Sequence, residues 1–81
     1  MSKEELILEI RKAISAEYSA IDQYMRLAED CDDEFTKKNL LEIVNDERTH
    51  VGQFLNCLFR LAPDEETFYT KGNAEADDAG K

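Results

Sequence analysis

Residues 40–61, LLEIVNDERTHVGQFLNCLFRL, carry apolar and ionisable side chains along one stripe. Its members recur every three or four positions, the period of an amphipathic helix. They are Leu40, Val44, Glu47, His50, Val51, Phe54, Leu58 and Leu61. Glu47 and His50 interrupt the apolar stripe, and their three-residue spacing puts both side chains on one helical face. The pattern predicts a long helix with a polar pair in its apolar interface.

The preceding segment carries a second stripe of the same period. Residues 2 to about 31 contain no Gly or Pro, and Ser2 followed by Glu5 matches a capping box at a helix start. The apolar positions are Leu6, Ile10, Ala13, Ile21, Tyr24 and Ala28. Glu17 falls in the middle of this stripe, where an apolar residue is expected. The first helix is therefore predicted to bring one carboxylate to its apolar face.

An acidic segment, residues 29–34, separates the two stripes. Asp32 or Asp33 can cap the second helix, whose positive N-terminal dipole favours acidic residues. Because the turn is short, two helices of about 28 residues and roughly 40 Å must run antiparallel. Glu17 lies fifteen residues before Asp32, and Glu47 lies fifteen residues after it. The two carboxylates are therefore predicted to face each other at one level.

The end of the chain departs from this pattern. Pro63 is expected to end the second helix, because proline cannot continue it. Residues 64–69 are predicted to form a short third helix with Phe68 as a docking residue. Residues 72–81 are small, acidic and nearly free of apolar side chains, as in a mobile tail.

Size and composition favour one small helical domain. With 81 residues, three Gly and one Pro, the chain is expected to be all-α, with two long antiparallel helices plus a short C-terminal helix. The expected division is a helical hairpin domain over residues 1–70 and a flexible acidic tail or linker over residues 71–81. A single copy this small buries only about 60% of its surface and is marginally stable. A second copy would supply the missing core.

Charge and hydropathy exclude several kinds of partner. The net charge is −9, from 19 acidic against 10 basic residues, so nucleic-acid phosphates would be repelled. No apolar run approaches the roughly 20 residues that span a bilayer, and residues 1–5 lack the core of a signal peptide. We therefore expect no membrane contact and a cytoplasmic location. Cys31 and Cys57 form no Cys-x-x-Cys unit and are expected to be reduced, with Cys57 buried as a small apolar residue.

Glu17, Glu47 and His50 make up half of a di-iron ligand arrangement. In ferritin-like bundles, two helices each give one Glu and two others each give a Glu-x-x-His pair. This chain has one helix of each kind. Homodimerisation would therefore complete a ferritin-like four-helix bundle, pooling four carboxylates and two imidazoles around two ions.

The carboxylates in the stripes need a compensating charge. Burying them uncompensated costs several kcal/mol, and the stripes contain no Lys or Arg, with Arg26 and Arg48 pointing away on helical phase. Glu oxygen and His nitrogen suit Fe(II), Mn(II) or Zn(II), and four Glu charges balance two divalent ions. The alternative is a bundle with protonated or solvated polar layers.

Tyr24 is a further candidate for the site, because it follows Glu17 by seven residues on the same helical face. Either its hydroxyl reaches a ligating carboxylate or a metal-bound water, or Tyr24 is an ordinary core tyrosine with its hydroxyl at the rim. The sequence leaves both possibilities open.

Taken together, these spacings resemble the encapsulated ferritins, short members of the ferritin-like superfamily. The resemblance rests on Ala16-Glu17, on Tyr24, and on residues 47–52, ERTHVG, and it covers roughly residues 5–70. It implies a two-helix protomer whose ferroxidase centre forms at a dimer interface, with dimers assembling into an open ring, typically a decamer.

The resemblance also implies an activity. Members of this family are cargo of an encapsulin shell, where they oxidise Fe(II) with O2 so that ferric mineral accumulates. The expectation is a ferroxidase with two irons per subunit pair, for iron storage and detoxification in a cytoplasmic encapsulin nanocompartment. Glu17, Glu47 and His50 would be the iron ligands, with Glu47 bridging and Tyr24 beside them.

Two features depart from the family pattern. Ala16 and Ser19 stand where some relatives have acidic residues of an outer metal site, and residues 72–81 lack an apolar shell-docking peptide. The second departure fits either a truncated chain or a domain otherwise fused to its shell protein. Two alternatives to the ferroxidase also stay open. One is a rubrerythrin-like di-iron peroxidase, for which this chain lacks a second, cysteine-ligated iron. The other is a non-catalytic helical assembly domain.

Overall fold

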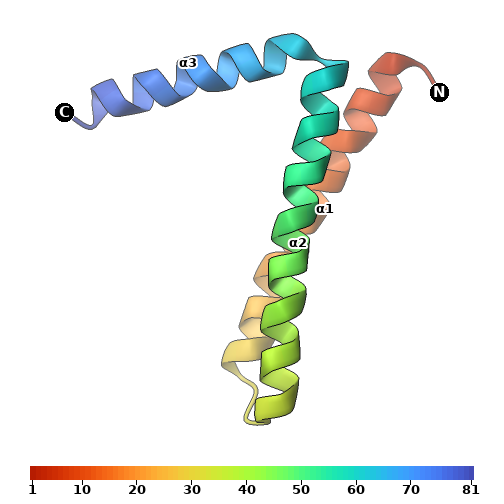
Figure 1. Cartoon of the computed structure of the whole chain (residues 1–81), viewed down its shortest axis with the longest axis vertical. Coiled ribbons are helices and arrows are strands. Elements are labelled where there is room, and N and C mark those ends of the chain that lie inside the picture. The colour runs from red at the N-terminus through yellow and green to blue at the C-terminus, as the bar shows by residue number, and fades with distance from the viewer.

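The computed structural model describes residues 1–81 as three helices joined by short turns: α1 (Lys3–Glu29), α2 (Glu34–Leu61) and α3 (Pro63–Ala79). Helices α1 and α2 lie side by side as an antiparallel hairpin, and α3 leaves the open end of that hairpin at a steep angle (Figure 1). The all-α expectation is confirmed, together with the two long helices and the short turn between them.

The two long helices begin at the residues that the sequence suggested. The Ser2 hydroxyl oxygen accepts a hydrogen bond of 3.1 Å from the backbone N–H of Glu5 and donates one of 3.1 Å to its carboxylate. Asp33 caps α2, where its carboxylate accepts hydrogen bonds from the Thr36 backbone N–H at 3.0 Å and from the Thr36 hydroxyl at 2.6 Å. The hydrogen bonds from Thr36 lower the pKa of Asp33 below its ordinary value of 3.8.

Contacts between α1 and α2 form a narrow core. Ile21 of α1 packs with Val44 and Val51 of α2, and these three side chains are buried. Half-buried residues surround them, namely Ile14, Tyr24 and Leu55. Only 5 of the 81 residues are buried in the single chain, which leaves many large apolar side chains exposed, including Phe35 and Leu41. A single copy therefore has little interior of its own, as its size predicts.

Helix α3 differs from the expectation for this part of the chain. It continues to Ala79, so residues 71–79, expected as part of a flexible tail, are helical here. Gly72 costs a helix only about 1 kcal/mol relative to Ala and does not end it. The helix begins at Pro63, and its first turn is acidic, both favourable at a helix N-terminus. The division of the chain into domains at residue 70 stays a prediction.

The residue that docks α3 on the hairpin is also different. Phe68, the predicted docking residue, is 65% exposed. Its neighbour Tyr69 instead packs edge-on against Phe59 of α2, with ring centroids 5.4 Å apart and planes at 83°. Adjacent residues on a helix point about 100° apart, so the direction of α3 decides which of the two aromatic rings meets α2.

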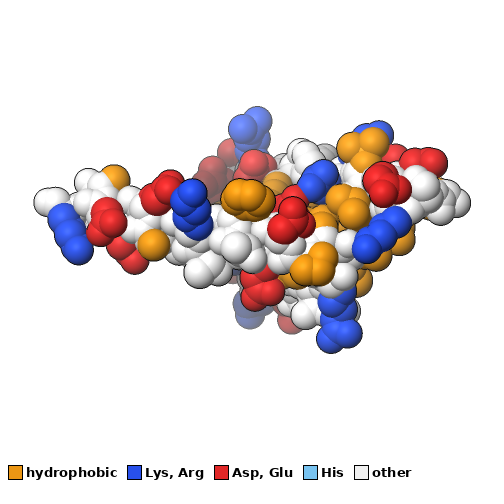
Figure 2. Space-filling view, turned by 90° about the horizontal axis from the view of Figure 1, so that it is seen from above, with side chains coloured by type: hydrophobic (Ala, Val, Ile, Leu, Met, Phe, Trp, Pro, Cys, Tyr) orange, Lys and Arg blue, Asp and Glu red, His pale blue; other side chains and the backbone are white.

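The molecule is flat, with extents of 45 × 44 × 14 Å. Seen from above, hydrophobic side chains lie at the surface among acidic and basic ones (Figure 2). None of its helices is both long enough and apolar enough to cross a membrane.

Candidate metal centre

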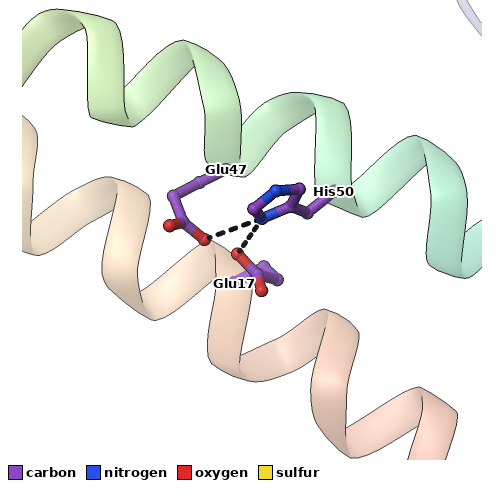
Figure 3. A group of neighbouring side chains, drawn as sticks. All are labelled: Glu17, Glu47 and His50. Atoms are coloured by element: carbon purple, nitrogen blue, oxygen red, sulfur yellow. Dashed lines mark ion pairs between the residues drawn. The ribbon is translucent and has the colours of Figure 1, made fainter.

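Glu17 of α1 and the pair Glu47 and His50 of α2 meet between the two long helices (Figure 3). The Nδ1 atom of His50 lies 3.8 Å from Oε2 of Glu17 and 3.7 Å from Oε2 of Glu47. One candidate ligand atom from each residue lies within 4.8 Å of the others. The prediction that the two carboxylates meet at one level, and that the histidine joins them, is confirmed as geometry.

The distances between His50 and the two carboxylates suit ligands of one shared cation better than direct hydrogen bonds between the side chains. Two ligand atoms about 2.1 Å from one ion lie about 3 to 3.5 Å apart, close to the distances between His50 and the carboxylates. Those distances exceed the usual 2.7–3.2 Å of an N–H···O hydrogen bond. A small inward movement of the side chains would place all three donors around one ion.

Burial adds a second reason for a cation. The side chains of Glu17 and Glu47 are 19% and 20% exposed, and that of His50 is 47% exposed. Oε2 of Glu17 is buried and has no hydrogen-bond partner. Leaving a buried acceptor unpaired costs about 1–3 kcal/mol, and more when it is charged. The donor set and this unpaired oxygen therefore fit a divalent transition metal.

No lysine or arginine forms an ion pair with the carboxylates. Arg48, two residues before His50, donates instead to Asn45 at 3.2 Å and contacts the sulfur of Met25 at 3.9 Å. Its predicted direction, away from Glu17 and Glu47, is confirmed. Apart from any metal, His50 is the only basic side chain that the subunit places beside these two carboxylates.

The group opens to one side of the hairpin. A cleft of about 380 Å³ is lined by Glu17, His50, Gln53, Phe54 and Cys57. Cys57 was expected to be buried, but it is exposed and lies along this cleft. Its position was readable from its spacing, since it follows His50 by seven residues and shares its helical face. Both Cys57 and Cys31 are free thiols.

Tyr24 is not part of the ligand group. Its side chain is half-buried and packs against the core of Ile21, Val44 and Val51. A separation of seven residues keeps two side chains on one helical face but moves them about 10 Å apart along the axis. A role for Tyr24 beside the ligands stays a prediction.

Comparisons with known proteins agree with this fold. A profile of the Rubrerythrin family matches residues 9–79. The chain also resembles the solved encapsulated ferritin domain from Pyrococcus furiosus, at 37% identity and a TM-score of 0.93, over 96% of this chain and 80% of that one. This chain therefore belongs to the rubrerythrin and ferritin-like proteins, and among them to the encapsulated ferritins.

A longer relative places such a domain beside another protein. The chain is 41% identical over 66 residues to a ferritin-like-encapsulin shell fusion protein of Pyrococcus furiosus. The match covers 82% of this chain but only 19% of that relative. The chain thus corresponds to a small part of the fusion protein.

Proposed function

We propose that two copies of this chain form a ferroxidase, which binds Fe(II) as substrate between them and oxidises it to Fe(III) with O2. The observation that carries the proposal is the group of Glu17, Glu47 and His50, with its unpaired buried oxygen on Glu17. One subunit supplies two carboxylates and one imidazole, which is half of the set used by di-iron carboxylate proteins. A second copy, related by a two-fold axis, would supply the other half.

Each residue has a defined task in this proposal. The four carboxylates of the pair would balance the charge of two Fe(II) ions, and Glu47 would bridge them. His50 must be neutral to bind, so iron uptake releases any proton that it shares with the carboxylates. Mixed nitrogen and oxygen ligation that leaves open positions allows iron to exchange electrons with O2. Tyr24 would act from beside the ligand set, through its hydroxyl.

The proposed setting is the interior of an encapsulin shell. The supporting observation is the relative that is a single ferritin-like-encapsulin shell fusion protein. We infer that pairs of this chain join into a ring, a decamer in the arrangement implied by the family. Such a ring would oxidise Fe(II) inside the shell, where ferric mineral accumulates.

Iron loading of the purified chain tests the proposal. We expect Fe(II) added without oxygen to bind at two ions per two chains, with anomalous scattering at the iron edge between Glu17, Glu47 and His50. Admission of O2 should then give a rapid rise in ferric absorbance in stopped-flow measurements. Binding without oxidation would contradict the ferroxidase, and a response to hydrogen peroxide alone would favour a peroxidase. Absence of bound iron would favour a non-catalytic assembly domain.

A further inference from the structure

The joint between α2 and α3 contains a single residue. Helix α2 ends at Leu61 and α3 begins at Pro63, so only Ala62 lies between them, at φ −132° and ψ 78°. Proline disfavours helical geometry in the residue before it, which explains why the chain bends there. The backbones of α1 and α3 do not pack, since no pair of their Cα atoms lies within 8 Å. Backbone packing against α1 therefore does not set the direction of α3.

One ion pair crosses the gap between α1 and α3. The guanidinium of Arg11 donates to the carboxylate of Glu65, and no other ion pair joins α3 to the hairpin. The Glu65 side chain is only 19% exposed, whereas that of Arg11 is 50% exposed. Partial burial of the carboxylate favours keeping the pair closed, because an unpaired charge there loses hydration.

Tyr69 extends this contact to α2. It lies one helical turn after Glu65, and a hydrogen bond to the Glu65 carboxylate raises the pKa of the Tyr69 hydroxyl. Its ring meets Phe59 of α2 edge-on, an arrangement that aromatic pairs favour. Tyr69 and Arg11 also line one wall of a cleft of about 560 Å³ whose other residues belong to the long helices. Side chains of α3 thus contact both long helices at one place.

We infer that Arg11, Glu65 and Tyr69 form a latch that holds α3 at a fixed angle to the hairpin, and that opening the latch lets α3 swing about Ala62. The inference goes beyond the proposed ferroxidase, because none of these residues belongs to the group of Glu17, Glu47 and His50. The latch fixes where α3 presents its exposed Phe68 and its acidic surface.

The latch should open at both ends of the pH scale. Arg11 lowers the pKa of Glu65 below its ordinary value of 4.5, so the closed state is favoured above that value and lost as the pH falls through the lowered pKa. The pKa of Tyr69 is raised above 10.0, so its contribution is present below that value and lost as the pH rises further. Tyr18 of α1 is the other titratable group facing the cluster, and the α2 residues beside it, Leu55, Leu58 and Phe59, do not titrate.

Distances between spin labels test the latch in the assembled protein. Cysteines are introduced at Gln23 of α1 and Ala76 of α3 after both native cysteines are changed to serine. Labelled chains are diluted with unlabelled ones, so that pulsed EPR reports distances within one subunit. We expect a narrow distribution of label-to-label distances in the otherwise unchanged protein. The distribution should broaden in Arg11→Gln and in Glu65→Gln. Exchanging the charges, with Arg11→Glu and Glu65→Arg together, should restore the narrow distance.

Lys12→Gln is the matched control, because it removes the same charge one residue away. Lys12 pairs only within its own helix, with Glu9 at 3.3 Å in solvent, so its loss should leave the distance narrow. A narrow, unshifted distance in Arg11→Gln, or an equal broadening in Lys12→Gln, would overturn the latch. Iron binding is measured on the same samples, so that failure of the proposed ferroxidase is seen separately.

Discussion

The oxygen Oε2 of Glu17 is the single atom that most constrains the function of this chain. It is buried without a hydrogen-bond partner, while the histidine nearest to it stands 3.8 Å away. A cation brought from outside the subunit would stabilise a carboxylate oxygen in that position. The sequence predicts that this carboxylate faces a second one, since Glu17 and Glu47 interrupt two apolar stripes at equal distances from the turn.

Substitution of the α2 ligands tests the assignment directly. We expect Glu47→Ala and His50→Ala each to slow Fe(II) oxidation by more than about 100-fold, because partners outside a ligand set already contribute 10–100-fold. Asp46→Ala is the control, since Asp46 is an exposed carboxylate next to Glu47. The initial rate of ferric absorbance after mixing with O2 is the measurement. Rates near those of the unchanged protein in both ligand variants would refute the assignment.

The positions of Cys57 and Tyr24 could not be predicted fully from the sequence. Cys57 was expected to be buried as a small apolar residue, and this is wrong. The thiol is exposed because no second layer covers that face of α2 in the single chain. Helical phase put Tyr24 on the face of Glu17, although its side chain packs on the core. Phase fixes a direction around the helix, whereas contact also requires the right height along it.

The long helices were predictable as elements because several local signals agree. The apolar periodicity and the capping residues indicated both α1 and α2, and the absence of Gly and Pro from residues 2–31 also supported α1. The short turn determined their antiparallel arrangement. Helix α3 gave weaker signals. Its composition resembles that of a mobile tail. Its docking residue depends on the direction that the chain takes after Ala62, which no local pattern encodes.

The cap of α2 gives a prediction at the scale of the element. We expect Asp33→Ala to lower the melting temperature, because the hydrogen bonds of Asp33 with Thr36 are lost. The pKa of Asp33 is lowered in the folded protein, so this stabilisation is present above its ordinary value of 3.8 and fades as the pH falls through the lowered pKa.

Thermal unfolding followed by circular dichroism measures this effect. The difference between Asp33→Ala and the unchanged protein should be full near neutral pH and should shrink in acid. Asp33→Asn serves as the control, since asparagine caps helices about as well as aspartate. A difference independent of pH would show that the carboxylate charge has no part in the cap.

At the scale of the whole molecule, assembly and metal binding should depend on each other. If two copies meet at their Glu17, Glu47 and His50 faces, four carboxylates approach one another and repel, and bound cations relieve this repulsion. We expect removal of metal by a chelator to shift the protein toward smaller species and added Fe(II) to reverse the shift, as linkage requires.

Native mass spectrometry at several metal levels checks this prediction. The variant with both Glu17→Gln and Glu47→Gln should stay assembled without metal and lose its response to Fe(II), because its facing side chains are neutral. If the distribution of oligomeric species does not change with metal, assembly does not depend on iron binding. That result would not test the oxidation of Fe(II).

The thinness of the molecule, 14 Å along its shortest axis, also limits how the chain can be redesigned. A single layer of helices has two broad faces and no second layer to pack against either of them. A stable monomeric version of the chain therefore needs another layer of helices. That layer must come from added helices or from two copies joined in one polypeptide. Engineering a stable monomer therefore requires added helices, and substitutions on the surface of a single copy would not be enough.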